Sequence, residues 1–221
     1  MPVAHSEILN QNQAKILPQL AFLENFGFYL AGGTALALQI GHRTSLDFDF
    51  YNQKHFSTPD LYDKIEKKFA NRAKKISQQK DTLFCKVDDV DLSFFWYRYN
   101  HIEKPRAYEG ILLASLKDIA AMKLVAVGHR PAKRDYIDIF YLLKKFSLEV
   151  IFSAARKKYA NFNGYLSLRA LTYFEDLEDP SQRSIKVLDP DFSWEKAKDK
   201  IFEEVKKYQL SILSPATGSA I

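Results

Sequence analysis

The chain has 221 residues, enough for one large domain or two small ones with a buried core. Its composition, 47% hydrophobic and 27% charged, is ordinary for a globular protein. The sequence contains no apolar run of about 18 residues that would predict a membrane span. A single cysteine, Cys85, excludes an internal disulfide, and the polar N-terminus lacks the apolar stretch of a signal peptide. We therefore expect a cytoplasmic protein with no membrane partner.

The chain carries 32 Lys and Arg residues against 27 Asp and Glu residues, a net charge of +5. This mild excess permits a polyanionic partner such as a nucleic acid but does not require one, because a charge of this size also keeps ordinary proteins in solution.

The first half of the chain alternates short apolar runs with helical patterns. The predicted elements are a helix over 8–26 kinked at Pro18, a strand over 28–31, a helix capped by Thr34 and ended by Gly41, a strand over 46–50 and a helix over 58–70 capped by Thr58. Three further strands, over 74–79, 83–87 and 90–99, have connections too short for crossovers and are expected to form an antiparallel meander.

The second half of the chain reads as almost wholly helical. The predicted helices begin at Ser115 and then cover 133–146, 148–159, 165–174 and 194–208, and the tail from Ser211 is expected to fray. Because the composition shifts near residues 105–110, we place a domain boundary there, which divides the chain into residues 1–108 and 109–221.

The first chemical feature is a Gly-Gly-Thr turn between a predicted strand and a predicted helix. Gly32 and Gly33 let the backbone approach a ligand closely, and the amides at a helix start attract phosphate. The hydroxyl of Thr34 would add one hydrogen bond. A Gly-Gly turn before a helix is also a common purely structural element.

The second feature is the pair of aspartates in the sequence Leu-Asp-Phe-Asp-Phe. Asp47 and Asp49 are two residues apart on a predicted strand, so both carboxylates point to one face. Neighbouring carboxylates repel each other and favour a cation, and Mg²⁺ prefers such oxygen ligands. The alternative is a solvated face of the strand.

A third carboxylate follows later in the chain. If the strand that contains Asp91 runs beside the strand of Asp47, Asp91 completes a set of three. Asp89 shares the same face, but its position in the Asp88-Asp89 turn favours a turn-forming role.

The order of these features resembles the polymerase-β-like nucleotidyltransferase signature. "YLAGGTALALQIGHRTSLDFDFY" is similar to the first motif of the AbiEii/AbiGii nucleotidyltransferase toxin family. "SLKDIAAMKLVAVGHRPAKRDYIDIFYLL" is similar to that family's Asp-x-x-x-x-Lys and Arg-Asp-x-x-Asp motifs. The resemblance extends over residues 28–143 and implies an α+β fold, with a nucleotidyltransferase core in residues 1–108. Residues 109–221 would form a helical domain that completes the cleft.

The resemblance also implies an activity and a set of roles. An NTP and two Mg²⁺ ions would be bound, and an acceptor hydroxyl would attack the α-phosphorus and release pyrophosphate. The implied metal ligands are Asp47, Asp49 and Asp91, and Asp91 would also help to deprotonate the acceptor. The implied nucleotide-binding residues are Gly32, Gly33, Thr34, Arg43, Lys123 and Arg134, and the last motif adds the acidic residues Asp135 and Asp138.

Several of these residues have structural alternatives. Lys123 lies on a mostly apolar helix, where a lysine either extends to solvent or reaches into a site. Arg134 and Asp138 could form a surface pair. Asp118 reads as a capping partner of Ser115 rather than a catalytic group. Arg43 could hold phosphate or structure its loop, and His42 reads as structural.

The resemblance and the basic clusters at residues 64–75, 130–134 and 156–158 lead us to expect an RNA acceptor, tRNA-like, with a cognate antitoxin as a protein partner. A protein or small-molecule acceptor, and an NTP- or RNA-binding relative without turnover, are the alternatives. The run Phe94-Phe95-Trp96-Tyr97 reads as core, with an interface or a base-stacking surface as alternatives.

Overall fold

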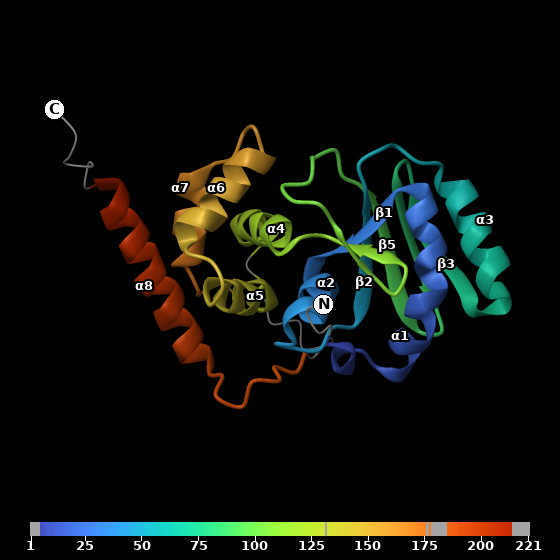
Figure 1. Ribbon diagram of the computed structural model, residues 1–221, viewed down its shortest axis with the longest axis horizontal. Helices are drawn as coiled ribbons and strands as arrows, with labels where there is room; N and C mark the ends of the chain where they lie inside the picture. The colour runs from blue at the N-terminus through green and yellow to red at the C-terminus, as the bar shows by residue number, and fades with distance from the viewer. Residues whose placement is uncertain (1–4, 131, 176, 178–184, 214–221) are drawn as a thin grey trace. The chain divides into compact units, whose positions relative to one another are not determined.

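The computed structural model describes residues 5–130, 132–175, 177 and 185–213 (Figure 1). Its elements follow in the order η1 (Ser6–Ile8), α1 (Gln11–Ile16), η2 (Leu17–Phe26), β1 (Phe28–Ala31), α2 (Gly32–Ile40), β2 (Asp47–Asn52), α3 (Thr58–Phe69), η3 (Ala70–Arg72), β3 (Ala73–Gln79), β4 (Thr82–Val87), β5 (Val90–Trp96), β6 (Arg106–Tyr108), β7 (Ile111–Leu113), α4 (Leu116–His129), α5 (Lys133–Leu143), α6 (Leu148–Lys158), α7 (Gly164–Leu171) and α8 (Trp194–Leu213). The labels η1 to η3 denote 3-10 helices.

Seven strands form one mixed sheet in the order β3-β4-β5-β2-β1-β7-β6. β2 runs parallel to β5 and β1 runs parallel to β7, whereas the other neighbours are antiparallel. The antiparallel meander that the short connections predict is present as β3-β4-β5. This sheet and its helices confirm the predicted α+β class.

The central strands β2 and β5 bury one face of the sheet. Phe48 and Phe50 of β2 and Leu92 and Phe94 of β5 are buried. The residues that alternate with them, Asp49 and Ser93, are half-exposed. This alternation arises because successive side chains of a strand point to opposite faces. The rings of Phe50 and Phe94 stack with 5.4 Å between their centroids, and Phe28 of β1 meets Phe94 edge-on. The buried face is therefore an aromatic core.

The first predicted helix is three shorter pieces. Residues 6–8 and 17–26 are 3-10 helices, and only Gln11–Ile16 is α-helical. Pro18 lies at the start of the second 3-10 helix, where its ring fits and its missing amide costs nothing. Gly27 ends the segment as predicted, with a φ of 80°. A single kinked helix was therefore the wrong prediction for residues 8–26.

Two predicted helix caps are replaced by neighbours. Helix α2 begins at Gly32 with Ala31 before it, and no side chain caps it. Helix α3 is capped by Ser57, whose hydroxyl accepts a hydrogen bond from the amide of Asp60, so Thr58 is already helical. Gly41 ends α2 as predicted, with a φ of 66°.

The second half of the chain contains a hairpin that the sequence did not predict. β6 and β7 join through Glu109 and Gly110, which have φ values of 48° and 77°. Such a two-residue turn with positive φ at both positions suits the twist of a tight hairpin. Three-residue strands are too short to show an alternating pattern, which explains why they were missed.

The chain divides into two compact units. Unit 1 contains residues 1–119 and 181–189, and unit 2 contains residues 120–180 and 190–221. A short segment from the second half of the chain thus returns to the unit that holds the sheet. The predicted domains 1–108 and 109–221, which were divided where the composition shifts, stay a prediction.

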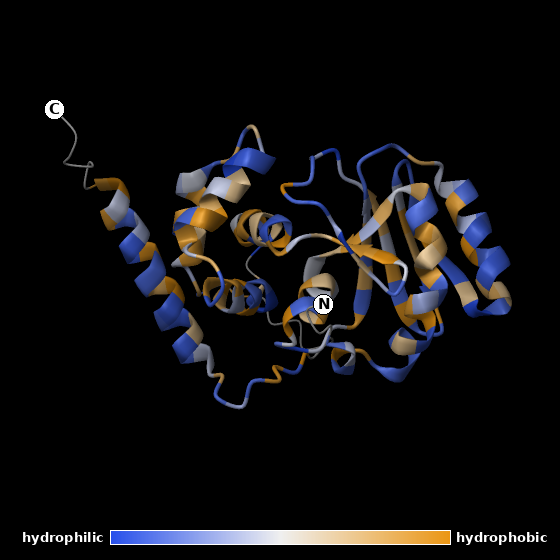
Figure 2. Cartoon of the chain, viewed as in Figure 1, coloured by the Kyte–Doolittle hydropathy of each residue, from blue (hydrophilic) through white to orange (hydrophobic). Residues whose placement is uncertain are grey.

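In unit 2, the helices α5, α6 and α7 each contact α8. Residues Ala197, Ile201, Val205 and Tyr208 of α8 are buried at helical spacing, and Figure 2 shows hydrophobic and hydrophilic residues along the same helix. α8 extends to Leu213, so the predicted fraying at Ser211 is wrong for residues 211–213, and residues 214–221 lie outside the described part. Among the described helices, none is long and apolar enough to cross a membrane.

Truncation of Phe94 tests the aromatic core. We expect Phe94→Ala to lower the free energy of unfolding by about 3–5 kcal/mol, because it removes a fully buried ring from between two others. Phe84→Ala, on the neighbouring strand β4 but 36% exposed, should cost about 1 kcal/mol or less. Urea titration followed by circular dichroism measures both, and equal losses would contradict this description of the core.

Candidate active site

Asp47 and Asp91 are neighbours across β2 and β5. The parallel register pairs Asp47 with Asp91 and Asp49 with Ser93. The residues that alternate with them, among them Phe48 and Leu92, are buried on the other face, and the two aspartates are half-exposed. The condition that Asp91 lies beside the strand of Asp47 is therefore met, with the two side chains on one face.

Asp89 occupies the β4–β5 turn. Asp88 and Asp89 have φ values of 46° and 66°, the left-handed region that aspartate tolerates better than most residues. Asp89 is also exposed. These observations confirm the turn-forming interpretation of this pair.

The Gly-Gly turn lies directly against Asp49. Gly32 has a φ of 69°, and a Cβ atom placed on it would be 2.9 Å from Oδ2 of Asp49. A Cβ atom on Gly33 would be 2.4 Å from Nη2 of Arg43. Backbone conformation and space therefore both favour glycine at Gly32, whereas a side chain at Gly33 would require the Arg43 guanidinium to shift. The half-exposed backbone of the turn is the start of helix α2.

Thr34 connects the start of α2 to the start of β2. Its hydroxyl donates to the backbone oxygen of Asp47 and hydrogen-bonds with Oγ of Ser45 at 2.6 Å. Thr34 is buried, so this hydroxyl is used within the protein rather than as a helix cap. It holds the first residue of the aspartate strand next to the Gly-Gly turn. Sequence reasoning missed Ser45, since an isolated serine in a loop carries no signal.

Arg43 is 2% exposed, and its contacts structure the loop between α2 and β2. Its Nη1 donates to the backbone oxygen of Thr44 at 2.9 Å, and its backbone forms a bridge with Val187. Thr44 and Lys186 exchange two further hydrogen bonds, both 2.9 Å long. Residues 186–188 were not predicted to contribute here, because no motif marks them.

Lys86 of β4 faces Asp91 across the ladder. Its ammonium lies 3.4 Å from Oδ1 of Asp91. Burial raises the pKa of the nearby Cys85 thiol to about 12, and the negative charge of Asp91 adds to this shift. The thiol is therefore neutral at physiological pH and is not a nucleophile there.

The donor set suits Mg²⁺. Within the described residues, no three His, Cys, Asp or Glu side chains are grouped closely enough to hold a metal ion by themselves. However, Mg²⁺ commonly takes one or two carboxylates and completes its shell with substrate phosphates and water. Asp47 and Asp91 start from in-register positions, and Asp49 lies against the turn expected to meet phosphate. These carboxylates would hold the metal.

Lys123 forms a buried ion-pair cluster within unit 2. Its ammonium lies 2.6 Å from Oδ1 of Asp135 and 2.6 Å from Oδ2 of Asp138, and both carboxylates are fully buried. Nε of Arg130 lies 3.4 Å from Asp135, so two cations meet two carboxylates. Lys123 is itself buried and therefore does not extend to solvent, and Asp138 is fully buried rather than on the surface. The catalytic roles of these residues, and nucleotide binding by Lys123 and Arg134, stay predictions.

Asp118 is a structural anchor. It accepts hydrogen bonds from the hydroxyl of Ser115 at 2.6 Å and from the backbone amides of Ile102 and Glu103. Its own amide donates to Oγ of Ser115, which completes the predicted cap of α4. The carboxylate thus ties the loop after β5 to the start of α4.

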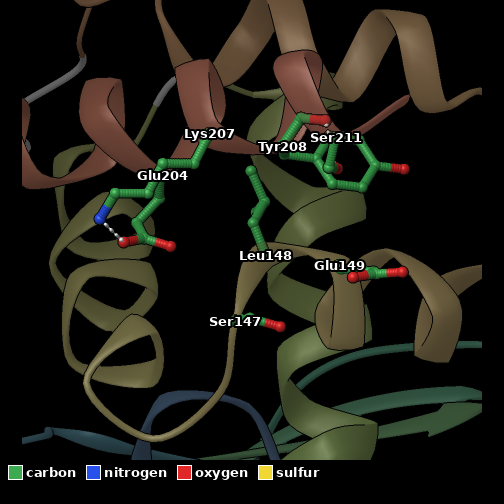
Figure 3. A pocket seen from close by; sticks show the side chains of 7 residues that line it. All are labelled: Ser147, Leu148, Glu149, Glu204, Lys207, Tyr208 and Ser211. Atoms are coloured by element: carbon green, nitrogen blue, oxygen red, sulfur yellow. Dashed lines mark hydrogen bonds and ion pairs between the residues drawn. The ribbon is translucent and has the colours of Figure 1, made fainter. Parts of the chain in front are cut away.

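An open hollow in unit 2 is lined by Ser147, Leu148, Glu149, Glu204, Lys207, Tyr208 and Ser211 (Figure 3). Burial acts to raise the pKa of Glu204, but hydrogen bonds from Lys207 and Lys200 hold this pKa below its usual range. None of the predicted site residues lines this hollow. The hydroxyl of Tyr208 accepts a hydrogen bond from Nη2 of Arg156 at 2.7 Å, so the hollow marks the junction of α6 and α8.

A mixed sheet carries the aspartates beside a Gly-Gly turn, which is the arrangement expected from the resemblance to nucleotidyltransferases. The family model described as "Nucleotidyl transferase AbiEii toxin, Type IV TA system" matches residues 17–212, and the chain belongs to this family. The predicted family resemblance and nucleotidyltransferase class are thereby confirmed.

Several known proteins are similar to this chain. The uncharacterized protein aq_aa25 of Aquifex aeolicus (strain VF5) is 37% identical over 187 residues, which cover 82% of this chain and 87% of that protein. JHP933 from Helicobacter pylori superposes with a TM-score of 0.56 at 18% identity, over 94% of this chain and 98% of its own. MenT4, a nucleotidyltransferase toxin from Mycobacterium tuberculosis H37Rv, superposes with a TM-score of 0.55 at 13% identity. The match covers 88% of this chain and 82% of the MenT4 chain. These two structures share the fold.

Removal of the Lys123 ammonium tests the buried cluster. We expect Lys123→Met to lower the free energy of unfolding by roughly 3–5 kcal/mol, because it leaves two buried carboxylates without their central cation. Lys117→Met, on the same helix, breaks an exposed pair with Glu103 and should cost about 1 kcal/mol or less.

A triple variant that adds Asp135→Asn and Asp138→Asn to Lys123→Met should recover part of the loss, since the buried carboxylate charges are removed and the remaining cation, Arg130, has a side chain that is 56% exposed. Urea unfolding of the four proteins provides the comparison. A Lys123→Met protein as stable as the wild type would refute the cluster.

Proposed function

We propose that this enzyme transfers an NMP group from an NTP to a hydroxyl of an RNA acceptor, tRNA-like, with Mg²⁺, and that it acts as a toxin held in check by a cognate antitoxin. The observation that carries the proposal is the placement of Asp47 beside Asp91, with Asp49 against the Gly-Gly turn. The description of the family, a toxin of a toxin–antitoxin system, supports the biological role. Both NTP and RNA occur in the cytoplasm, where we place the reaction.

The Gly-Gly turn would bind the triphosphate. The backbone at Gly32 and Gly33 is half-exposed and carries no side chain between a ligand and the first amides of α2. Because Asp49 lies against the same turn, phosphate and carboxylate oxygens would face each other at close range. When bound, Mg²⁺ would neutralise this charge and stabilise the attacking and leaving oxygens.

Asp91 would accept the proton of the acceptor hydroxyl. As the hydroxyl oxygen bonds to the α-phosphorus, the bond to the bridging oxygen breaks, pyrophosphate leaves and the proton passes to a carboxylate. Asp91 is half-exposed near the start of β5, and the ammonium of Lys86 lies 3.4 Å from its Oδ1 atom. Asp47 at the same level of β2 would orient the reacting groups.

The first experiment is transfer from each of four labelled NTPs onto total bacterial RNA with Mg²⁺. We expect one labelled RNA class with the wild type and none with Asp49→Ala. No transfer to any RNA by the intact protein would reject the RNA acceptor. Transfer to a protein or a small molecule under the same conditions would replace it.

Asp91 offers a matched pair of substitutions. Asp91→Asn should lower kcat by roughly 100- to 10,000-fold, the usual contribution of a general base. Asp89→Asn, two residues away in the turn, removes the same charge but keeps a residue that tolerates a positive φ, so kcat should stay within about twofold of the wild type. Equal activity of the two variants would remove Asp91 from the mechanism.

A further inference from the structure

Four aromatic side chains continue the aspartate face of the sheet. Phe95 of β5 pairs in register with Tyr51 of β2, and their ring centroids are 5.4 Å apart. The ring centroid of Phe84 on β4 lies 5.5 Å from that of Phe95, and the ring centroid of Tyr97 lies 5.2 Å from that of Tyr51. We name Phe84, Phe95, Tyr51 and Tyr97 the aromatic strip.

The strip lies on the same face of the sheet as Asp47, Asp49 and Asp91. Tyr51 is two residues after Asp49, and Phe95 is two residues after Ser93, the partner of Asp49. Residues two apart on a strand share a face and are roughly 7 Å apart. The strip therefore begins about one nucleotide length from Asp49. Strands β2 and β5, which carry Tyr51 and Phe95, are neighbours in the sheet (Figure 1).

The strip is not part of the aromatic core. Phe84 is 36% exposed, and Phe95, Tyr51 and Tyr97 are half-exposed, whereas Phe94 on the opposite face is fully buried. Of the run of residues 94–97 that the sequence assigned to the core, only Phe94 is buried. Aromatic rings that stay accessible beside a reaction site indicate a ligand with flat, stackable groups.

Positive charges flank the strip. Lys86 is two residues after Phe84 on β4 and pairs in register with Lys74 of β3, so both belong to the same face. At the other end, the guanidinium of Arg98 lies 5.4 Å from the centroid of the Tyr99 ring. Stacking rings with basic residues beside them are the combination that binds single-stranded nucleic acid: the rings take the bases and the cations track the phosphates.

From this placement we infer that the aromatic strip stacks the unpaired bases next to the reacting hydroxyl of the RNA acceptor. The inference rests on the proposed function and specifies its substrate as a single-stranded end. In a duplex the faces of the bases are already stacked on each other, so a duplex would not engage the rings. Lys74 and Lys86 would meet the phosphates of the same strand.

The test is binding of a short fluorescein-labelled single-stranded oligoadenylate to the full chain without NTP, followed by fluorescence anisotropy. We expect Phe84→Ala and Phe84→Leu to raise the Kd roughly 5- to 100-fold, since leucine keeps the apolar area but lacks the ring. Phe84→Tyr should bind as the wild type does. The matched control is Phe202→Ala on α8, a 57% exposed phenylalanine in the other unit, which should leave the Kd unchanged.

Asp49→Ala separates the strip from the chemistry, because it should lose transfer and still bind the oligonucleotide. Strip-dependent binding by a wild type that transfers nothing to RNA would reject the proposed reaction and keep the strip. An unchanged Kd for Phe84→Ala, equal affinity for a blunt duplex of the same length, or an effect of Phe84→Ala on the KM for NTP alone would overturn the inference.

Discussion

The parallel pairing of β2 with β5 is the constraint on which the site depends. It places Asp47 beside Asp91 and, two residues further along each strand, Asp49 beside Ser93. Side chains on a strand alternate with a period of two, so a shift of one residue would turn the aspartates into the aromatic core and its phenylalanines toward solvent. Burying those carboxylates without partners would be very costly. The hydrophobic pattern of the two strands therefore sets the position of the charged groups as well as of the core.

The two downstream motifs separate into two internal networks. Asp118 binds the hydroxyl of Ser115 and two loop amides, whereas Lys123 binds Asp135 and Asp138 on the next helix. Charged residues in a motif are usually assigned to substrate, but here their observed partners are within the protein. A buried cation between two carboxylates is poorly replaced by any single substitution, because each change leaves an unpaired charge. The loss of activity expected from such variants would thus combine chemistry with folding.

The sequence predicted the strand of Asp47, the meander, the turn at Asp88-Asp89 and the glycines that end the first helices, because each depends on local patterns. The parallel neighbour of β2 could be stated only as a condition, since strand pairing is a non-local property. The cap at Thr34 was wrong because a hydroxyl can serve a helix end or a distant carbonyl, and the bond to Asp47 spans 13 residues. The hairpin of β6 and β7 was missed because three residues show no period. The sequence left open whether Lys123 extends to solvent or reaches inward, since its partners lie on another helix.

Residues 186–188 lie far along the chain from every side chain assigned to catalysis, yet they hydrogen-bond the loop between α2 and β2. The unit that contains the sheet is thus assembled from residues 1–119 and the distant segment 181–189. A stop codon placed ahead of residue 186 would produce a shortened protein that still contains Asp47, Asp91 and Lys123 but has lost the segment that steadies Arg43. Late truncations in the gene would therefore be expected among its inactivating mutations, and an N-terminal fragment would be a poor substitute for the whole enzyme.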